Sequence, residues 1–255
     1  MFAIAGGLLS LGATGCKDNK VETADNFATL EAQFADPSSE YRTAPFMVWN
    51  GKVTEAEIDR MLKEFKDAGC GGAFIHPRPG LITEYMSDEW YSLFRHAVDK
   101  GKEMGLDIWI YDENSYPSGF AGGHVPEEMP ESYNQGQGLV LTKADLLPDK
   151  TDEYFIILKK EGDKWTDITQ TLGAYKKAKG EYYLYKKTSL GKSDWYGGYS
   201  YVDLLVPGVT EKFIDVTMKG YEKTIKEEFG KSVFGVFSDE PNISSPGGLR
   251  WTPDL

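Results

Sequence analysis

Glu240 is the residue whose position in this sequence best suits acid–base chemistry. It follows Asp239 directly after the apolar run 233–237. A carboxyl group held at the end of a buried strand and partly removed from water keeps its proton to near neutrality, so it can donate that proton to a leaving oxygen. Cleavage of a glycosidic bond needs such an acid and a second carboxylate across the bond. The structural alternative is that Asp239 or Glu240 caps the next segment or pairs with Arg78.

Polar side chains also follow two earlier apolar runs. Asp112 and Glu113 could accept hydrogen bonds from sugar hydroxyls or hold a metal as a pair, although an acidic turn is an equal alternative because Asp and Asn favour turns. His76 and Arg78 could bind a hydroxyl or a carboxylate, or the prolines beside them could form a rigid corner.

Aromatic residues at the ends of these runs could contact a sugar ring. Trp49 and Tyr111 could stack on its face, although an aromatic residue at the end of a strand is more often part of the core. His124 follows two glycines and could line the same site, whereas His96 is expected to serve packing or the surface. The predicted substrate-binding residues are Trp49, His76, Arg78, Tyr111, Asp112, Glu113, Asn114, His124 and Asp239.

Several other chemistries are not indicated. The sequence has no spaced Cys and His ligands, no Gly-rich phosphate loop and no G-x-S-x-G motif. We therefore expect no metal site and no cofactor within this chain, and a sugar isomerase-like barrel is disfavoured because it needs a metal cluster. The formal net charge of -12 would repel phosphate backbones, so nucleic acid is not expected as a partner.

The candidate residues follow four apolar runs, at 44–50, 71–75, 106–110 and 233–237, and helical patterns lie between the runs. Thr54 and Glu57 predict a capping box for the first helix, and Ser87 predicts the cap of a second helix over 88–104 that ends at Gly105. Thr210 predicts the cap of a third helix. The expected apolar stripes are Ile58, Met61, Leu62 and Phe65 in the first helix, and Ile214, Met218, Tyr221 and Ile225 in the third.

Continuous apolar strands that alternate with helices are typical of a parallel α/β sheet, in which ligands bind at the carboxyl ends of the strands. The segment 139–205 differs, because short alternating stretches are separated there by turn residues. We interpret it as an inserted β subdomain. The expected fold is thus a partial (β/α)8 barrel over 41–255 with this insertion.

The N-terminus has the features of a targeting segment. Residues 2–15 are apolar and small, too few to span a bilayer, and Cys16 with a charged run follows them. We interpret 1–16 as a lipoprotein signal peptide that ends at the lipidated Cys16, and 17–40 as a tether. Four glycines disfavour the alternative of a buried helix, although the basic residue expected before an apolar signal is absent. A lipid anchor predicts a location in the cell envelope, and Lys17 favours the outer membrane.

Five short motifs resemble glycoside hydrolase family 106. They are Phe-Met-Val-Trp-Asn-Gly at 46–51, Tyr-Asp-Glu-Asn at 111–114, Pro-Ser-Gly at 117–119, Ala-Gly-Gly at 121–123 and Asp-Glu-Pro at 239–241. The resemblance implies a (β/α)8 barrel with β-rich accessory domains, inverting α-L-rhamnosidase activity on plant-derived glycans, and calcium in the site. It also implies that Glu240 is the general acid and that Asp112 and Glu113 face the sugar.

The second carboxylate and the calcium ligands of that family would come from strands beyond the four predicted here. Eight βα units with an insertion need far more than 255 residues, so we expect the N-terminal part of a longer barrel, inactive on its own. The expected partners are an oligosaccharide or polysaccharide substrate and, through the lipid alone, a membrane. The alternative function is a non-catalytic carbohydrate-binding surface lipoprotein, which would use the same aromatic residues.

Overall fold

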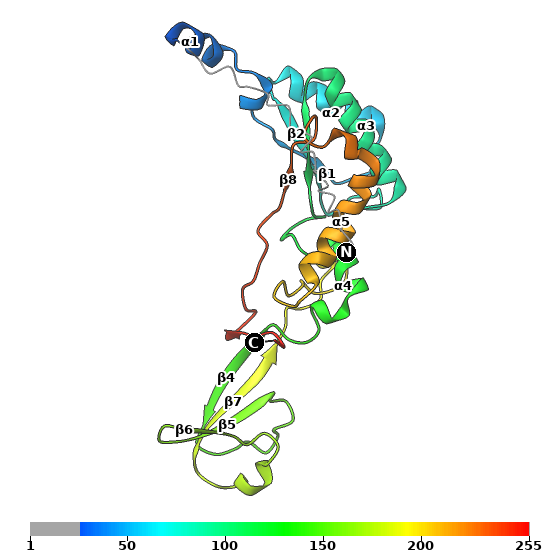
Figure 1. Ribbon diagram of the computed structural model, residues 1–255. Helices are drawn as coiled ribbons and strands as arrows, with labels where there is room; N and C mark the ends of the chain where they lie inside the picture. Colours follow the sequence, from blue (N-terminus) through cyan, green and yellow to red (C-terminus); the bar gives the residue numbers. More distant parts are fainter. Residues whose placement is uncertain (1–25, 255) are drawn as a thin grey trace, which may run out of the picture.

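The computed structural model describes residues 26–254, which form an α/β protein with two sheets (Figure 1). A four-stranded parallel sheet has the strand order β1-β2-β3-β8, and a curled five-stranded antiparallel sheet has the order β6-β5-β7-β4-β9. The predicted signal peptide with Cys16 lies outside the described residues. No helix within 26–254 is long and apolar enough to cross a membrane.

The parallel sheet consists of β1 (Phe46–Trp49), β2 (Gly72–Pro77), β3 (Asp107–Tyr111) and β8 (Val236–Phe237). The helices are α1 (Phe27–Ala35), α2 (Glu55–Asp67), α3 (Asp88–Met104), α4 (His124–Glu128) and α5 (Val209–Ile225). The antiparallel sheet consists of β4 (Gly138–Ala144), β5 (Ile156–Glu161), β6 (Lys164–Asp167), β7 (Glu181–Thr188) and β9 (Leu249–Arg250). The expected parallel α/β architecture is confirmed for four strands, whereas closure into a barrel stays a prediction.

Two of the three predicted helix starts are confirmed. The Thr54 hydroxyl accepts a hydrogen bond from the Glu57 N–H at 3.3 Å at the start of α2, and Ser87 accepts one from the Trp90 N–H at 3.2 Å at the start of α3. Helix α3 ends at Gly105 in the left-handed conformation, with φ 68°. These caps satisfy backbone N–H groups that have no partner inside a helix.

The third helix differs from the prediction at its start and on its buried face. Helix α5 begins at Val209 after Gly208, so Thr210 lies inside it and does not cap it. Three residues of the predicted stripe are confirmed, because Tyr221 and Ile225 are buried and Met218 packs against the main core. Ile214 is 54% exposed, and Phe213 and Thr217 are buried in the first half of the helix instead.

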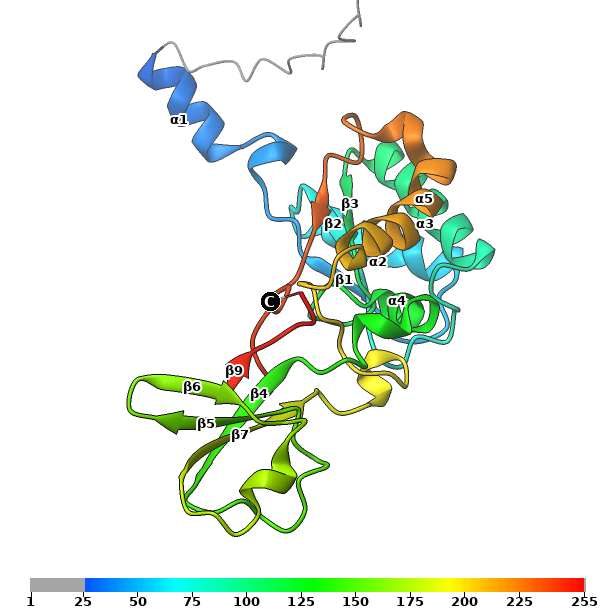
Figure 2. The same ribbon diagram turned by 60° about the horizontal axis from the view of Figure 1, so that its bottom comes forward.

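The main core lies between the parallel sheet and α2, α3 and α5, which cover one of its faces (Figure 2). Alternate strand residues such as Met47 and Ile75 point into it. The Trp90 indole N–H donates to the Tyr221 hydroxyl at 3.2 Å and so joins α3 to α5. The opposite face carries Phe46 and Val48, which are 42% and 38% exposed.

The antiparallel sheet lies far from α1, at the other end of an elongated molecule (Figures 1 and 2). One of its faces packs on a small core that contains Ile157, Tyr182 and Leu184. Residues 201 and 202, which the sequence places in the insertion, pack instead with Phe120 and Val125 of the α/β part. Residues 27–35, expected within a tether, form helix α1, which buries none of its side chains.

Candidate functional site

The four predicted strand ends meet at one edge of the parallel sheet. Trp49 pairs with Pro77 and Tyr111 pairs with Phe237, so the residues that follow each strand are neighbours. The rings of His76 and Tyr111 lie 3.7 Å apart between centroids. They lie on the face of the sheet away from the helices, because the preceding residues Ile75 and Ile110 point into the main core. We refer to His76, Arg78, Tyr111, Asp239 and Glu240 as the strand-end cluster.

Tyr111 connects β3 to the carboxylate after β8. Its hydroxyl lies within hydrogen-bonding distance of the Asp239 carboxylate and, at 2.8 Å, of the Ser115 carbonyl oxygen. A phenol has one proton, so it donates to one of these two acceptors at a time. Burial, followed by the contact with Asp239, raises the pKa of Tyr111 well above its ordinary value, which keeps the hydroxyl protonated.

His76 is completely buried, and neither of its ring nitrogens has a hydrogen-bond partner among the described residues. Burial and the nearby Arg78 charge lower the pKa of His76 to about 4. The imidazole is therefore neutral at neutral pH. It packs against the Tyr111 ring, and because it is buried it is not accessible to a ligand. Arg78 is half-buried and lies over the Tyr116 ring, 5.5 Å from its centroid.

Asp112 points away from the strand-end cluster. It is 4% exposed, and its Oδ1 accepts a hydrogen bond from the Ser118 hydroxyl at 2.5 Å. The Asp239 N–H in turn donates to the Ser118 hydroxyl at 2.8 Å. Burial raises the pKa of Asp112 to about 6. Asp112 borders a cavity of about 280 Å³ whose apolar lining includes Phe213 and Ile214 of α5.

Glu113 is also buried, and both of its oxygens are occupied by backbone N–H donors. Its Oε1 accepts from Asn114 and Gly122, and its Oε2 accepts from residues 119, 120 and 121, at 2.5–3.1 Å. Burial is the larger effect and raises the pKa of this carboxyl to about 8, although the amide donors act to lower it. All five neighbours are donors, so only the ionised form can contact all of them.

These contacts correct the expectation that Asp112 and Glu113 face a sugar. Both carboxylates hold the loop between β3 and α4, and Glu113 has no oxygen free for a ligand. Asn114 is different, because its buried Oδ1 has no partner among the described residues. The alternative of an acidic turn therefore fits Asp112 and Glu113 better than direct binding of a sugar does.

Glu240 is exposed, with φ 47° in the left-handed region. The partial burial expected for Glu240 is therefore not present in the described structure. Asp239 beside it is half-buried and is fixed by Tyr111 and Ser118. Neither carboxylate forms an ion pair with Arg78 in the described part of the chain.

Two other predicted residues lie outside the strand-end cluster. Trp49 is 2% exposed and packs edge-on against Trp90, with ring centroids 5.0 Å apart, which fits the alternative of a core residue. His124 begins α4, and its ring lies 6.5 Å from that of Tyr85. His96 pairs with Asp59 across α2 and α3 at 2.8 Å, as expected of a packing residue.

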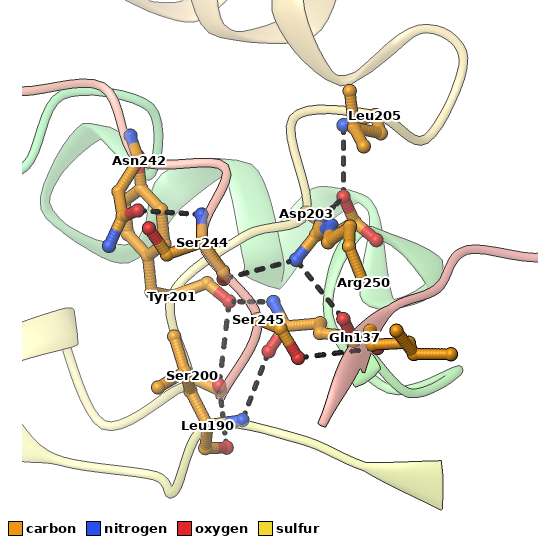
Figure 3. A network of polar contacts seen from close by, with 11 residues as sticks. Gln137, Leu190, Ser200, Tyr201, Asp203, Leu205, Asn242, Ser244, Ser245 and Arg250 are labelled. Atoms are coloured by element: carbon orange, nitrogen blue, oxygen red, sulfur yellow. Dashed lines mark hydrogen bonds and ion pairs between the residues drawn. The ribbon is translucent and has the colours of Figure 1, made fainter. Parts of the chain in front are cut away.

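Residues that the sequence reasoning missed hold the segment after β8 in place (Figure 3). The Tyr201 hydroxyl donates to the Ser118 carbonyl oxygen at 2.7 Å and accepts from the Asn242 N–H at 3.0 Å. Farther along, Arg250 forms an ion pair with the buried Asp203 and donates to the Gln137 carbonyl oxygen at 3.2 Å. These partners are remote in sequence, so no local pattern indicates them.

Within residues 26–254 no group of three or more His, Cys, Asp or Glu side chains is arranged to hold a metal ion. The calcium ligands that the resemblance implies were expected from later strands, so calcium binding stays a prediction. A cavity of about 610 Å³ lies near the amino ends of the strands and is lined by residues such as Ser39, Arg42 and Cys70. It is remote from the strand-end cluster.

Comparison with protein-family models gives no match, and no curated protein matches. Among solved structures, a rhamnosidase from Novosphingobium sp. PP1Y is similar to 48% of this chain, with a TM-score of 0.35 and 26% identity. The similar part spans 12% of the length of that rhamnosidase chain. The chain is thus an α/β protein with partial structural similarity to a bacterial rhamnosidase over about half its length.

Proposed function

We propose that this chain supplies part of the catalytic site of a glycoside hydrolase that acts on α-L-rhamnosides, with Glu240 as the general acid. The observation that carries the proposal is the strand-end cluster. It presents the exposed carboxyl of Glu240 beside the fixed carboxylate of Asp239, at the edge of the sheet where parallel α/β proteins bind ligands. The sequence motifs around both residues support the same class of enzyme.

The cluster offers three groups to a sugar. Arg78 and Asp239 are half-buried and Glu240 is exposed, so each can reach a ligand on the open side. The guanidinium donates hydrogen bonds to hydroxyl oxygens, and the carboxylates accept hydrogen bonds from hydroxyl groups. Tyr111 positions Asp239 by a hydrogen bond, and His76 packs against the Tyr111 ring. Glu113 positions the neighbouring loop.

In the proposed reaction, Glu240 gives its proton to the glycosidic oxygen while the bond from that oxygen to the anomeric carbon breaks. A second carboxylate removes a proton from water, and the resulting hydroxyl attacks the anomeric carbon from the opposite face, which inverts its configuration. That second carboxylate would come from residues outside this chain. Enclosure of Glu240 by a bound sugar would supply the desolvation that its exposed side chain lacks.

A comparison of turnover with binding separates this proposal from a carbohydrate-binding lipoprotein. The native protein, isolated with an antibody against residues 41–130, is tested with Glu240→Gln and with Glu161→Gln, a control at an exposed glutamate on β5. We expect Glu240→Gln to lose turnover of an aryl α-L-rhamnoside but to keep binding the sugar, and Glu161→Gln to change neither. Sugar binding without turnover in the unaltered protein would favour the binding protein and contradict the hydrolase.

The proposed location is the cell envelope, through a lipid on Cys16. The support is the sequence of residues 2–16 alone, which precedes the described part of the chain. We expect Cys16→Ala to move the protein from the detergent-extractable membrane fraction to the aqueous fraction, as judged by immunoblotting of both fractions. Unchanged extraction would contradict the anchor.

A further inference from the structure

One face of the antiparallel sheet carries aromatic rings and lysines side by side. Lys143 pairs with Tyr183 and Lys160 pairs with Trp165, and paired residues of neighbouring strands point the same way. Lys160 also pairs with Glu181, two residues before Tyr183 on β7, so all four side chains lie on the same face. Lys187 of β7 belongs to this face as well, four residues after Tyr183. The small core packs on the other face, around Ile157, Tyr182 and Leu184. We call this the aromatic–lysine face.

The ammonium groups of this face lie over the rings. Lys143 Nζ is 4.7 Å from the centroid of the Tyr183 ring, and Lys160 Nζ is 5.2 Å from that of Trp165. The Tyr183 and Trp165 rings meet at 4.6 Å with an angle of 67° between their planes. Attraction between each cation and its ring holds both in place, so the surface is formed before any ligand arrives.

A second ring–lysine group lies at the other end of the face. Lys187 Nζ is 4.1 Å from the ring centroids of both Phe155 and Trp251. These two rings are themselves 4.9 Å apart. Phe155 is 42% exposed and Trp165 is 47% exposed, so each group offers ring surface to solvent.

The charge of this region differs from that of the whole chain. Residues 138–192 contain eleven lysines and eight acidic residues, whereas the chain has a formal net charge of -12. In the described part of the chain, Lys143, Lys160 and Lys187 form no ion pair. Of the acidic residues on the face, Glu181 accepts from the Tyr183 hydroxyl at 2.5 Å, and Asp167 accepts from Thr169.

We infer that the aromatic–lysine face binds a carboxylated polysaccharide, such as a chain of uronic acid units. The C–H faces of a pyranose ring pack on exposed aromatic rings, and the ammonium groups pair with the sugar carboxylates. A neutral glycan would not need the lysines. Single-stranded nucleic acid is less suitable, because residues 138–192 contain no arginine to bind phosphate through two parallel hydrogen bonds.

This inference goes beyond the proposed function, because the surface lies on β4–β7 and β9 and not at the strand-end cluster. Binding is measured without catalysis, so its outcome does not depend on Glu240. The probes are polygalacturonate, the same polymer with its carboxyl groups fully methyl-esterified, and oligothymidylate, each titrated calorimetrically into the full chain at low ionic strength.

We expect only polygalacturonate, of the three probes, to bind. Its affinity should fall about tenfold in Lys160→Gln and about tenfold in Trp165→Ala. The matched control is Lys164→Gln, which removes the same charge from β6 on the opposite face and should leave the affinity unchanged. All three side chains are on the surface strand β6 or its neighbour β5, and thermal unfolding checks that each variant folds. Equal binding of the methyl ester, preference for oligothymidylate, equal weakening by Lys164→Gln, or no binding would each overturn the inference.

Discussion

His76 shows how burial can remove the chemistry that a residue type suggests. It follows an apolar run and precedes a proline, so the sequence allowed either a ligand-binding histidine or a rigid corner. The structure places it beneath Tyr111 with both nitrogens unpartnered among the described residues, which makes it a neutral support. Sequence could identify the position but not the burial, because the burial comes from Phe46 and Tyr111 on other strands.

The lowered pKa of His76 makes stability depend on pH. The unfolded chain protonates this residue below about pH 6.5, whereas the folded protein does so only near pH 4, so stability falls as the pH drops through that window. Between about pH 7.5 and pH 5, we expect the free energy of unfolding to fall by about 2 kcal/mol more in the unaltered protein than in His76→Phe. Urea unfolding at both pH values measures this difference. Asp112 titrates with the opposite sign, but it does so in both proteins. Parallel pH profiles would contradict the buried neutral imidazole.

Glu113 and Glu240 each have the opposite exposure to the one predicted from the sequence. Glu113 was expected in a sugar-facing loop and is enclosed by five amides, whereas Glu240 was expected to be partly buried and is exposed. The glycines at 119, 122 and 123 are the signal that a tight loop surrounds Glu113, since all three have positive φ. No sequence pattern near Glu240 indicates that the chain after β8 leaves this side chain exposed.

At the scale of elements, patterns of short range were predictable and pairings of long range were not. The caps at Thr54 and Ser87 depend on residues three positions apart, and both are confirmed. Strand β8 was expected over 233–237 but contains only Val236 and Phe237, which pair with Ile110 and Tyr111 of β3. Strand β9 was not expected, since its partner β4 lies more than a hundred residues earlier.

The ion pair between Arg250 and Asp203 fixes β9 and the segment that carries Glu240. Asp203 is 1% exposed, so removal of its partner leaves a buried charge uncompensated. We expect Arg250→Met to lower the free energy of unfolding by about 3 kcal/mol, and Asp203→Asn in the same chain to recover part of the loss. Lys186→Met, which removes an exposed pair with Glu153, should cost less than about 1 kcal/mol. Equal losses in urea unfolding would contradict a structural role for the buried pair.

At the scale of the whole molecule, the parallel sheet has two open edges and one open face. β1 and β8 are the edge strands, and Phe46, Val48 and Val236 are each more than a third exposed. Edges and apolar faces of this kind normally pair or become covered. Further parallel strands, as in a closed barrel, would pair with both edges and enclose the open face of the parallel sheet, which is consistent with the architecture expected from the sequence.

If Glu240 protonates the leaving oxygen, replacing Glu240 should slow the reaction most for leaving groups that need a proton. The native protein and its Glu240→Gln variant are compared on two α-L-rhamnosides, one with a dinitrophenyl group that leaves without a proton and one with an alkyl group that needs it. We expect kcat to fall about 100- to 10,000-fold on the alkyl rhamnoside and far less on the dinitrophenyl rhamnoside. An equal fall on both substrates, or no fall on either, would contradict the assignment of Glu240 as the general acid.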